Sequence, residues 1–309
     1  MGNWFKTTLL LGVMTVLIVF IGRLLGGQQG MIFAFLLAIG MNFFSYFYSD
    51  KIVLKMYRAQ EVTPAENPSI FSIVSELARN AQLPMPRIYI IPEDTPNAFA
   101  TGRNPKHAVV AVTRGLLNLM NRDEIRGVLA HEMAHIKNRD ILIGSIAATM
   151  AGAIMIVAQM ARWTAFFGGG SDDDEGGLGI IGLIAMSILA PIAAMLVQMA
   201  ISRSREYHAD STGVSFTGQP SGLANALEKL GAYSGRIPMH TKKPNTAHMF
   251  IVNPLRGGNI ANLFSTHPPL QERIARLRGD HSFRDRHNGE ERDDQRGLRE
   301  ARNNWDRLS

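Results

Sequence analysis

Apolar residues are concentrated in four long blocks, at 7–25, 31–48, 141–167 and 178–201. Each block provides about the 20 apolar residues that a helix needs to cross a bilayer. Only a short loop rich in Gly and Gln separates the first two blocks, and no small-residue cleavage site of a signal peptide lies between them. The pattern predicts four membrane-spanning helices in two hairpins. For the second pair, the alternative is a buried hairpin in the core of a soluble domain.

The polar segments between and after the blocks contain shorter stretches with the periodicity of helices or strands. The stretch "ENPSIFSIVSELARNAQLP" shows a helical apolar face behind Asn67 and Pro68, whereas "PRIYIIPED" and "KHAVVAV" are typical of strands. A further helix is predicted to begin at Asn121, because Glu124 three residues later completes a capping box. Three more helices are expected in "SREYHADSTG", "QPSGLANALEKLGAY" and "STHPPLQERIARLRG". The segment between the hairpins is therefore expected to be a compact α+β unit.

The charged residues indicate how the blocks are oriented. Lysine and arginine follow the second and fourth blocks, whereas the loop at 168–177 is acidic and contains neither. The positive-inside rule therefore places both termini and the 51–140 segment in the cytoplasm. The net charge of +6 comes without a basic stripe interleaved with aromatic residues, so a nucleic-acid partner is not expected. The chain has no cysteine, which excludes disulfides, thiolate metal ligands and cysteine-protease chemistry.

The helix predicted at Asn121 contains the sequence "HEMAH". His131 and His135 are four residues apart, so both can direct an imidazole nitrogen at one ion. Glu132 lies about 100° around the helix from His131, which keeps it off the metal but close to a water that the metal binds. Zinc lowers the pKa of such a water towards about 7, and a carboxylate can then accept its proton. The pattern predicts a hydrolytic metal site with Glu132 as general acid and base.

A catalytic zinc site needs a third protein ligand and an open position. Asn138 and Ile141 exclude the metzincin extension, and Asp140, five residues past His135, is expected to face away. The sequence "EYHAD" after the fourth block offers Glu206 as the ligand, with His208 as the competing candidate. Asp210 lies on the same helical face as Glu206 and could orient a histidine through its other ring nitrogen.

"HEMAHIKNRD", "SREYHAD", "PNAFATG" and "THPPLQERI" occur in the order seen in the HtpX-type heat-shock membrane proteases, relatives of the CAAX prenyl endoprotease. The resemblance covers the chain to about Gly279. It agrees with one zinc ion held by His131, His135 and Glu206. It also implies a substrate-binding edge strand or loop at Asn97, Ala98, Phe99 and Ala100, which could pair with an extended peptide, and an oxyanion donor at His267. A helix-entry role for His267 is the alternative.

The resemblance implies an α+β membrane protein, mostly helical, with a zincin-like catalytic domain and a small β-sheet. The expected segments are a transmembrane hairpin (1–50), a catalytic part (51–140), a second transmembrane hairpin (141–201), a helical part with the third ligand (202–279) and a charged tail (280–309). The implied activity is zinc-dependent endopeptidase cleavage of misfolded or damaged membrane proteins under stress. The implied location is the bacterial inner membrane, where the lipid bilayer and unfolded polypeptides are the partners. The sequence indicates no oligomeric state.

Three other functions are compatible with parts of the sequence, but each lacks a feature that it would need or leaves one unexplained. A specific processing protease of the CAAX prenyl endoprotease type would need a substrate chamber formed by more spans than four. An inactive membrane scaffold would have no use for Glu132 beside both histidines. A zinc-gated transporter is disfavoured because no charged residue interrupts the second and fourth blocks.

Overall fold

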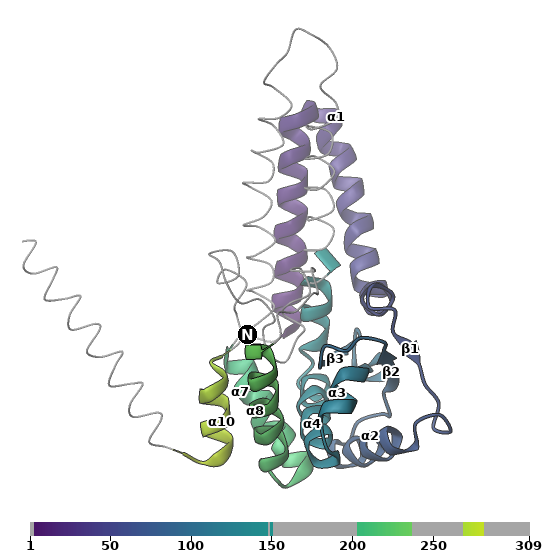
Figure 1. Ribbon diagram of the computed structural model, residues 1–309. Helices are drawn as coiled ribbons and strands as arrows, with labels where there is room; N and C mark the ends of the chain where they lie inside the picture. The colour runs from purple at the N-terminus through teal and green to yellow at the C-terminus, as the bar shows by residue number, and fades with distance from the viewer. Residues whose placement is uncertain (1–2, 148, 151–202, 237–267, 281–309) are drawn as a thin grey trace, which may run out of the picture.

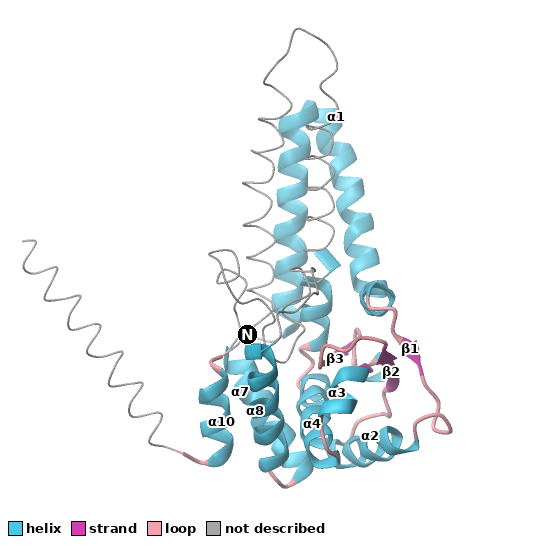
Figure 2. Cartoon of the chain, in the orientation of Figure 1, coloured by secondary structure: helices cyan, strands magenta, loops and turns pink. Residues whose placement is uncertain are grey.

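The computed structural model describes residues 3–147, 149–150, 203–236 and 268–280. A tall helical hairpin stands on a broader part made of helices and a short sheet (Figure 1). Helix predominates throughout, and the strands are few and short (Figure 2). The chain is helical at 141–147 and 149–150, where the third apolar block begins. The rest of the predicted second hairpin, His267 and nearly all of the charged tail lie outside the described residues.

The first two apolar blocks form one helical element that folds back on itself. Helix α1 runs Asn3–Met56 over 54 residues, and Gly27 within it has a φ of +59°, a conformation that suits glycine. Asn42 Nδ2 donates a hydrogen bond of 2.8 Å to Thr15 Oγ1. A straight helix would hold these residues roughly 40 Å apart, so the chain reverses between them. Figure 1 shows the two arms side by side.

The second arm has the properties of a membrane span. Gly27–Met56 is long and apolar enough to cross a bilayer, and Thr7–Phe20 is a shorter apolar stretch in the first arm. Large apolar side chains point outwards, with Phe33 70% and Leu36 63% exposed, as expected of a surface that faces lipid. The described residues thus contain one helix that meets the length of a span, and the predicted total of four spans stays a prediction.

A four-stranded sheet lies below the hairpin. The strands are β1 (Gln60–Glu61), β2 (Arg87–Ile91), β3 (Ala98–Thr101) and β4 (Val109–Thr113). Their order is β1-β2-β4-β3, with β2 parallel to β4 and the other pairs antiparallel. The strands predicted within "PRIYIIPED" and "KHAVVAV" are confirmed as β2 and β4. β3 is an edge strand, so one side of its backbone is available to other groups.

The sheet is joined to the hairpin by a small apolar core. Val53, Leu54 and Tyr57 pack with Phe99 and other sheet residues. The Tyr57 and Phe99 rings lie 5.6 Å apart. The boundary expected between residues 50 and 51 therefore falls inside α1, because the last turns of the helix already belong to the core of the catalytic part.

The remaining helices form the base of the molecule. They are α2 (Pro68–Ala81), α3 (Arg114–Leu119), α4 (Arg122–Lys137), α7 (Arg203–Thr217), α8 (Ser221–Arg236) and α10 (Leu270–Arg278), with a 3₁₀ turn η1 (Pro105–His107). The capping box predicted for α4 is present: Glu124 N donates to the Asn121 side chain and Asn121 N donates to Glu124. α4 packs against α2, α7, α8 and β3, and it is the helix that carries "HEMAH".

Candidate metal centre and active site

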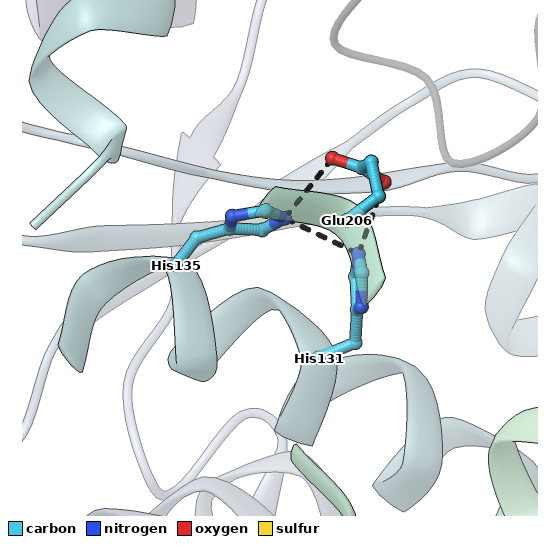
Figure 3. A group of neighbouring side chains, drawn as sticks. All are labelled: His131, His135 and Glu206. Carbon is cyan, nitrogen blue, oxygen red and sulfur yellow. Dashed lines mark hydrogen bonds and ion pairs between the residues drawn. The ribbon is translucent and has the colours of Figure 1, made fainter. Parts of the chain in front are cut away.

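Three predicted ligands meet between α4 and α7. His131 and His135 project from α4 and Glu206 projects from α7 (Figure 3). One ligand atom from each lies within 4.8 Å of the others. The two Nε2 atoms are 3.2 Å apart, and the Glu206 carboxylate oxygens lie 3.7 Å from His131 Nε2 and 3.6 Å from His135 Nε2. His208, the competing candidate, is exposed and is not part of this group.

The close approach of α7 to α4 depends on a glycine. A Cβ atom placed on Gly213 would lie 3.0 Å from the backbone carbon of Ala130 and 3.0 Å from the nitrogen of His131. Any larger residue would therefore push α7 away from the turn of α4 that carries the first histidine. Gly213 lies about two turns after Glu206, so the spacing between the helices controls where the carboxylate lies.

Asp210 contacts the first histidine as its spacing from Glu206 predicted. Its Oδ1 lies 2.8 Å from His131 Nδ1, which leaves Nε2 directed at Glu206. Burial alone would raise the pKa of the Asp210 carboxyl, but Arg273 and His131 lower it to about 2. The carboxylate is therefore charged, and it can hold the imidazole in one orientation.

Asp140 contacts the second histidine, which corrects the expectation that it faces away. Its Oδ2 lies 3.1 Å from His135 Nδ1. The reason is the end of α4: Arg139 adopts a left-handed φ of 57°, so the chain turns back and Asp140 N donates to His135 O. Burial lowers the pKa of His135, but Asp140, Glu206 and Glu132 outweigh it and raise this pKa to about 10.

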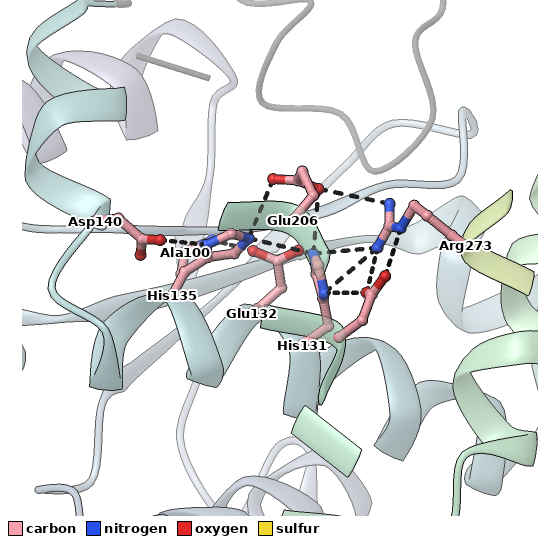
Figure 4. Close-up of polar contacts among 8 residues, drawn as sticks. Ala100, His131, Glu132, His135, Asp140, Glu206 and Arg273 are labelled. Carbon is pink, nitrogen blue, oxygen red and sulfur yellow. Dashed lines mark hydrogen bonds and ion pairs between the residues drawn. The ribbon is translucent and has the colours of Figure 1, made fainter. Parts of the chain in front are cut away.

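Glu132 lies beside the cluster and is fixed by the edge strand. The residue is only 6% exposed, and its Oε2 accepts a hydrogen bond of 2.9 Å from Ala100 N. Burial raises the pKa of the Glu132 carboxyl, although His131 and His135 act in the opposite direction. Figure 4 shows the carboxylate between the two histidines and the backbone of Ala100.

The four predicted substrate-binding residues differ in where they lie. Ala98–Ala100 belong to the edge strand β3, and within the described residues Ala100 is the one bonded to Glu132. Asn97 is buried at the start of the strand, where its N–H donates to Thr113 Oγ1. Phe99 is buried in the core below the hairpin. The backbone of β3, rather than these side chains, therefore faces the site.

Arg273 is a site residue that sequence reasoning missed. Its side chain, from α10, is 1% exposed and donates to both carboxylate oxygens of Asp210, at 2.9 and 2.7 Å. Its Nη1 lies 3.6 Å from Glu206 Oε2. Figure 4 shows it at the end of the cluster opposite Asp140. The available signal was its position on the apolar face of the predicted helix, three residues after Leu270 and next to Ile274.

We expect Arg273→Met to destabilise the metal-free protein by about 3–5 kcal/mol, because it leaves buried carboxylates without their cation. Arg273→Lys keeps the charge but cannot form the bidentate pair, so its effect is expected to be smaller. Thermal unfolding in detergent measures both variants. Arg276→Met is the matched control, since that side chain is 42% exposed and pairs with Glu272 on the same helix. Equal stability of Arg273→Met and Arg276→Met would contradict this prediction.

Comparison with known proteins agrees with the geometry. Residues 64–281 match the model of peptidase family M48. A protease HtpX homolog of Desulfatibacillum aliphaticivorans is 66% identical over 280 residues, which are 90% of each chain. One from Pyrococcus furiosus is 56% identical over 277 residues, covering 90% of this chain and 96% of the relative. The crystal structure of S. mikatae Ste24p has a TM-score of 0.46 and 19% identity, covering 86% of this chain and 62% of that one.

These relatives extend over the hairpin as well as the metal centre, because the aligned residues make up nine-tenths of the chain. Both of these relatives are named as proteases, and the family match includes the whole of α4, α7 and α10. The chain therefore belongs to peptidase family M48, among the HtpX-type membrane metalloproteases.

Proposed function

We propose that this protein is a zinc-dependent endopeptidase that uses His131, His135 and Glu206 as metal ligands and Glu132 as general acid and base. The observation that carries the proposal is the position of Glu132. Its buried carboxylate lies beside a cluster of three metal-binding side chains and is bonded to an edge strand. A structural metal site would need no such carboxylate.

The donor set suits one zinc ion per chain. Two imidazoles and one carboxylate form a known catalytic zinc set, which leaves a fourth position open. Ligand bonds of about 2.0–2.1 Å in a tetrahedron require donor atoms roughly 3.3–3.4 Å apart. The separations of 3.2, 3.6 and 3.7 Å are close to that requirement. When bound, zinc would act as a Lewis acid that polarises a carbonyl and acidifies a water.

The protein groups would then handle the proton and the substrate. Glu132 would accept a proton from the attacking water and return it to the leaving amine. Burial raises the pKa of the Glu132 carboxyl, which makes it a better acceptor for the proton of the water. An extended peptide could pair with the part of the β3 edge that Glu132 leaves open, which would place a scissile bond beside Glu132. His267 as an oxyanion donor stays a sequence-based proposal.

The proposed substrates and location follow from the short distance along the chain between the metal centre and the third apolar block. α4 ends at Lys137 and the chain is helical again from residue 141, so the metal centre is within a few residues of the third apolar block. A site so close to a bilayer could cleave loops and ends of misfolded or damaged membrane proteins. We propose that it does so in stress-related quality control. The protein would cross the inner membrane several times, with its active site at the cytoplasmic face.

The direct test is casein cleavage by the detergent-solubilised protein with and without a chelator. We expect chelation to abolish cleavage and added zinc to restore it, because the ligand cluster has no other source of Lewis acidity. Cleavage that survives complete removal of metal would exclude the metalloprotease mechanism. Absence of cleavage in the zinc-loaded protein would favour the inactive scaffold.

The orientation can be tested with single cysteines, because the chain has none of its own. We expect Asp173→Cys, in the acidic loop of the sequence, to react with an impermeant thiol reagent in intact cells. Ser211→Cys, at an exposed position of α7, should react only after the membrane is opened. The reverse pattern would invert the orientation and remove the cytoplasmic location.

A further inference from the structure

A change from aromatic to basic residues marks one face of the second arm of α1. Phe43, Phe47, Lys51 and Lys55 follow one another at four-residue intervals, so they share that face. The rings of Phe43 and Phe47 lie 4.7 Å apart, and both lysines are exposed. Tyr48 contacts Lys51 through its ring. Tyrosine beside lysine at the end of an apolar arm is typical of the headgroup level of a bilayer.

The loop after β3 brings two further cations to this level. The Arg103 guanidinium lies 5.5 Å from the centre of the Phe47 ring, one turn from Lys51 along the same face. Lys106, three residues further along the loop, is exposed. We refer to Lys51, Arg103 and Lys106 as the interfacial basic patch. Because Phe47 is the last aromatic residue of the face, contact with it places the loop beside the headgroups.

The patch is not neutralised by the protein around it. Across the residues that the structure describes, no carboxylate forms an ion pair with any of the three cations. The nearby acid Asp50 lies 3.6 Å from Arg87 instead. Arg103 Nη2 lies 3.0 Å from His107 Nε2, an uncharged partner when the imidazole is neutral. The positive charge is therefore available to a ligand outside the protein.

The loop is also connected to the catalytic residues. It follows β3, whose last residue Thr101 contacts Ser145 through their hydroxyl oxygens at 2.6 Å. One residue earlier, Ala100 N donates to Glu132. The end of β3 is thus attached to the start of the third apolar block on one side and reaches the hairpin through Arg103 on the other. Fixing the loop would fix the strand that holds Glu132.

We propose that the interfacial basic patch binds the phosphate of anionic phospholipids and that this contact steadies β3 for catalysis. The inference rests on the proposed insertion of α1 in a membrane and on the proposed role of Glu132. Phosphate is the complementary group, since cations at headgroup depth attract anionic lipids and Arg pairs well with phosphate oxygens. Phosphatidylglycerol supplies that charge, whereas phosphatidylcholine is neutral overall.

The binding test uses the full chain with Glu132→Gln, so that self-cleavage cannot interfere. Native mass spectrometry would count phosphatidylglycerol and phosphatidylcholine molecules that the protein retains from mixed micelles. We expect a preference for phosphatidylglycerol that falls about 5-fold for each cation removed by Lys51→Gln and Arg103→Gln. Lys51→Arg with Arg103→Lys keeps both charges and should keep the preference. Arg79→Gln with Arg122→Gln, two exposed arginines on α2 and α4, is the matched control.

Equal retention of the two lipids, or equal losses in the patch and control variants, would overturn the binding site. The catalytic part is tested with Glu132 intact, by peptide cleavage in liposomes with an increasing share of phosphatidylglycerol. We expect the rate to rise for the wild type and the control, and to stay flat for Lys51→Gln with Arg103→Gln. A patch variant that responds like the wild type would overturn the link to β3. Because the binding test needs no proteolysis, an inactive wild type would refute the proposed function without touching the lipid site.

Discussion

Glu132→Gln is expected to retain its metal and to lose proteolysis by about 10²–10⁴-fold or more, the contribution of a general acid and base. Glutamine has nearly the same shape, and its amide oxygen can still accept the hydrogen bond from Ala100 N. It cannot take a proton from water, however. Metal analysis of the purified protein and casein cleavage in detergent measure the two properties on one sample.

Glu228→Gln is the control for this substitution, since that glutamate is 45% exposed on α8 and pairs with Arg278. It should keep both metal and activity. Turnover by Glu132→Gln at the wild-type rate would remove Glu132 from the mechanism. Loss of metal together with activity would instead make Glu132 part of the binding site.

The second large effect is expected at the third ligand. Glu206→Ala should weaken zinc binding by more than about 100-fold and abolish proteolysis, because it removes one of three ligand groups. Asp210→Ala should weaken zinc by about 10–100-fold, the usual cost of losing the carboxylate that orients a ligand histidine. Competition with a zinc-binding dye measures the affinity without reference to activity.

His208→Ala provides the matched comparison, because it lies two residues from Glu206 but is exposed. We expect it to bind zinc as the wild type does. Normal zinc binding by Glu206→Ala together with weak binding by His208→Ala would transfer the ligand role to His208. A loss in Asp210→Ala as large as in Glu206→Ala would show that the metal depends equally on the orientation of His131.

Local spacing was enough to predict much of the fold and of the cluster. The i and i+4 positions of His131 and His135 follow from the helical repeat, and the same repeat places Asp210 on the face of Glu206. The capping box at Asn121, the two strands and the apolar arms of α1 also depend on residues close together in the chain. Such patterns are visible in the sequence because neighbouring residues alone produce them.

Contacts that depend on how the chain turns back or packs could not be predicted from spacing. Asp140 was expected to face away, since its number alone puts it off the ligand face, but the left-handed turn at Arg139 redirects it towards His135. Arg273 reaches Asp210 across 63 residues and His131 across 142. An arginine on an amphipathic helix is usually exposed, and only its buried partners make its burial favourable. Ala100 similarly gains its role because β3 lies at the edge of the sheet.

The sequence by itself therefore determined the residue types of the proposed ligand cluster, their helical spacing, the position of Glu132 next to His131 and the apolar arm that can cross a membrane. The tertiary structure decided which groups surround that site: the second carboxylate at His135, the guanidinium between Asp210 and Glu206, and the backbone N–H at Glu132. The physical reason is that periodicity reports which face of an element a residue occupies, whereas tertiary packing, of α4 against α7 and β3 and of α10 against α7, decides what that face meets.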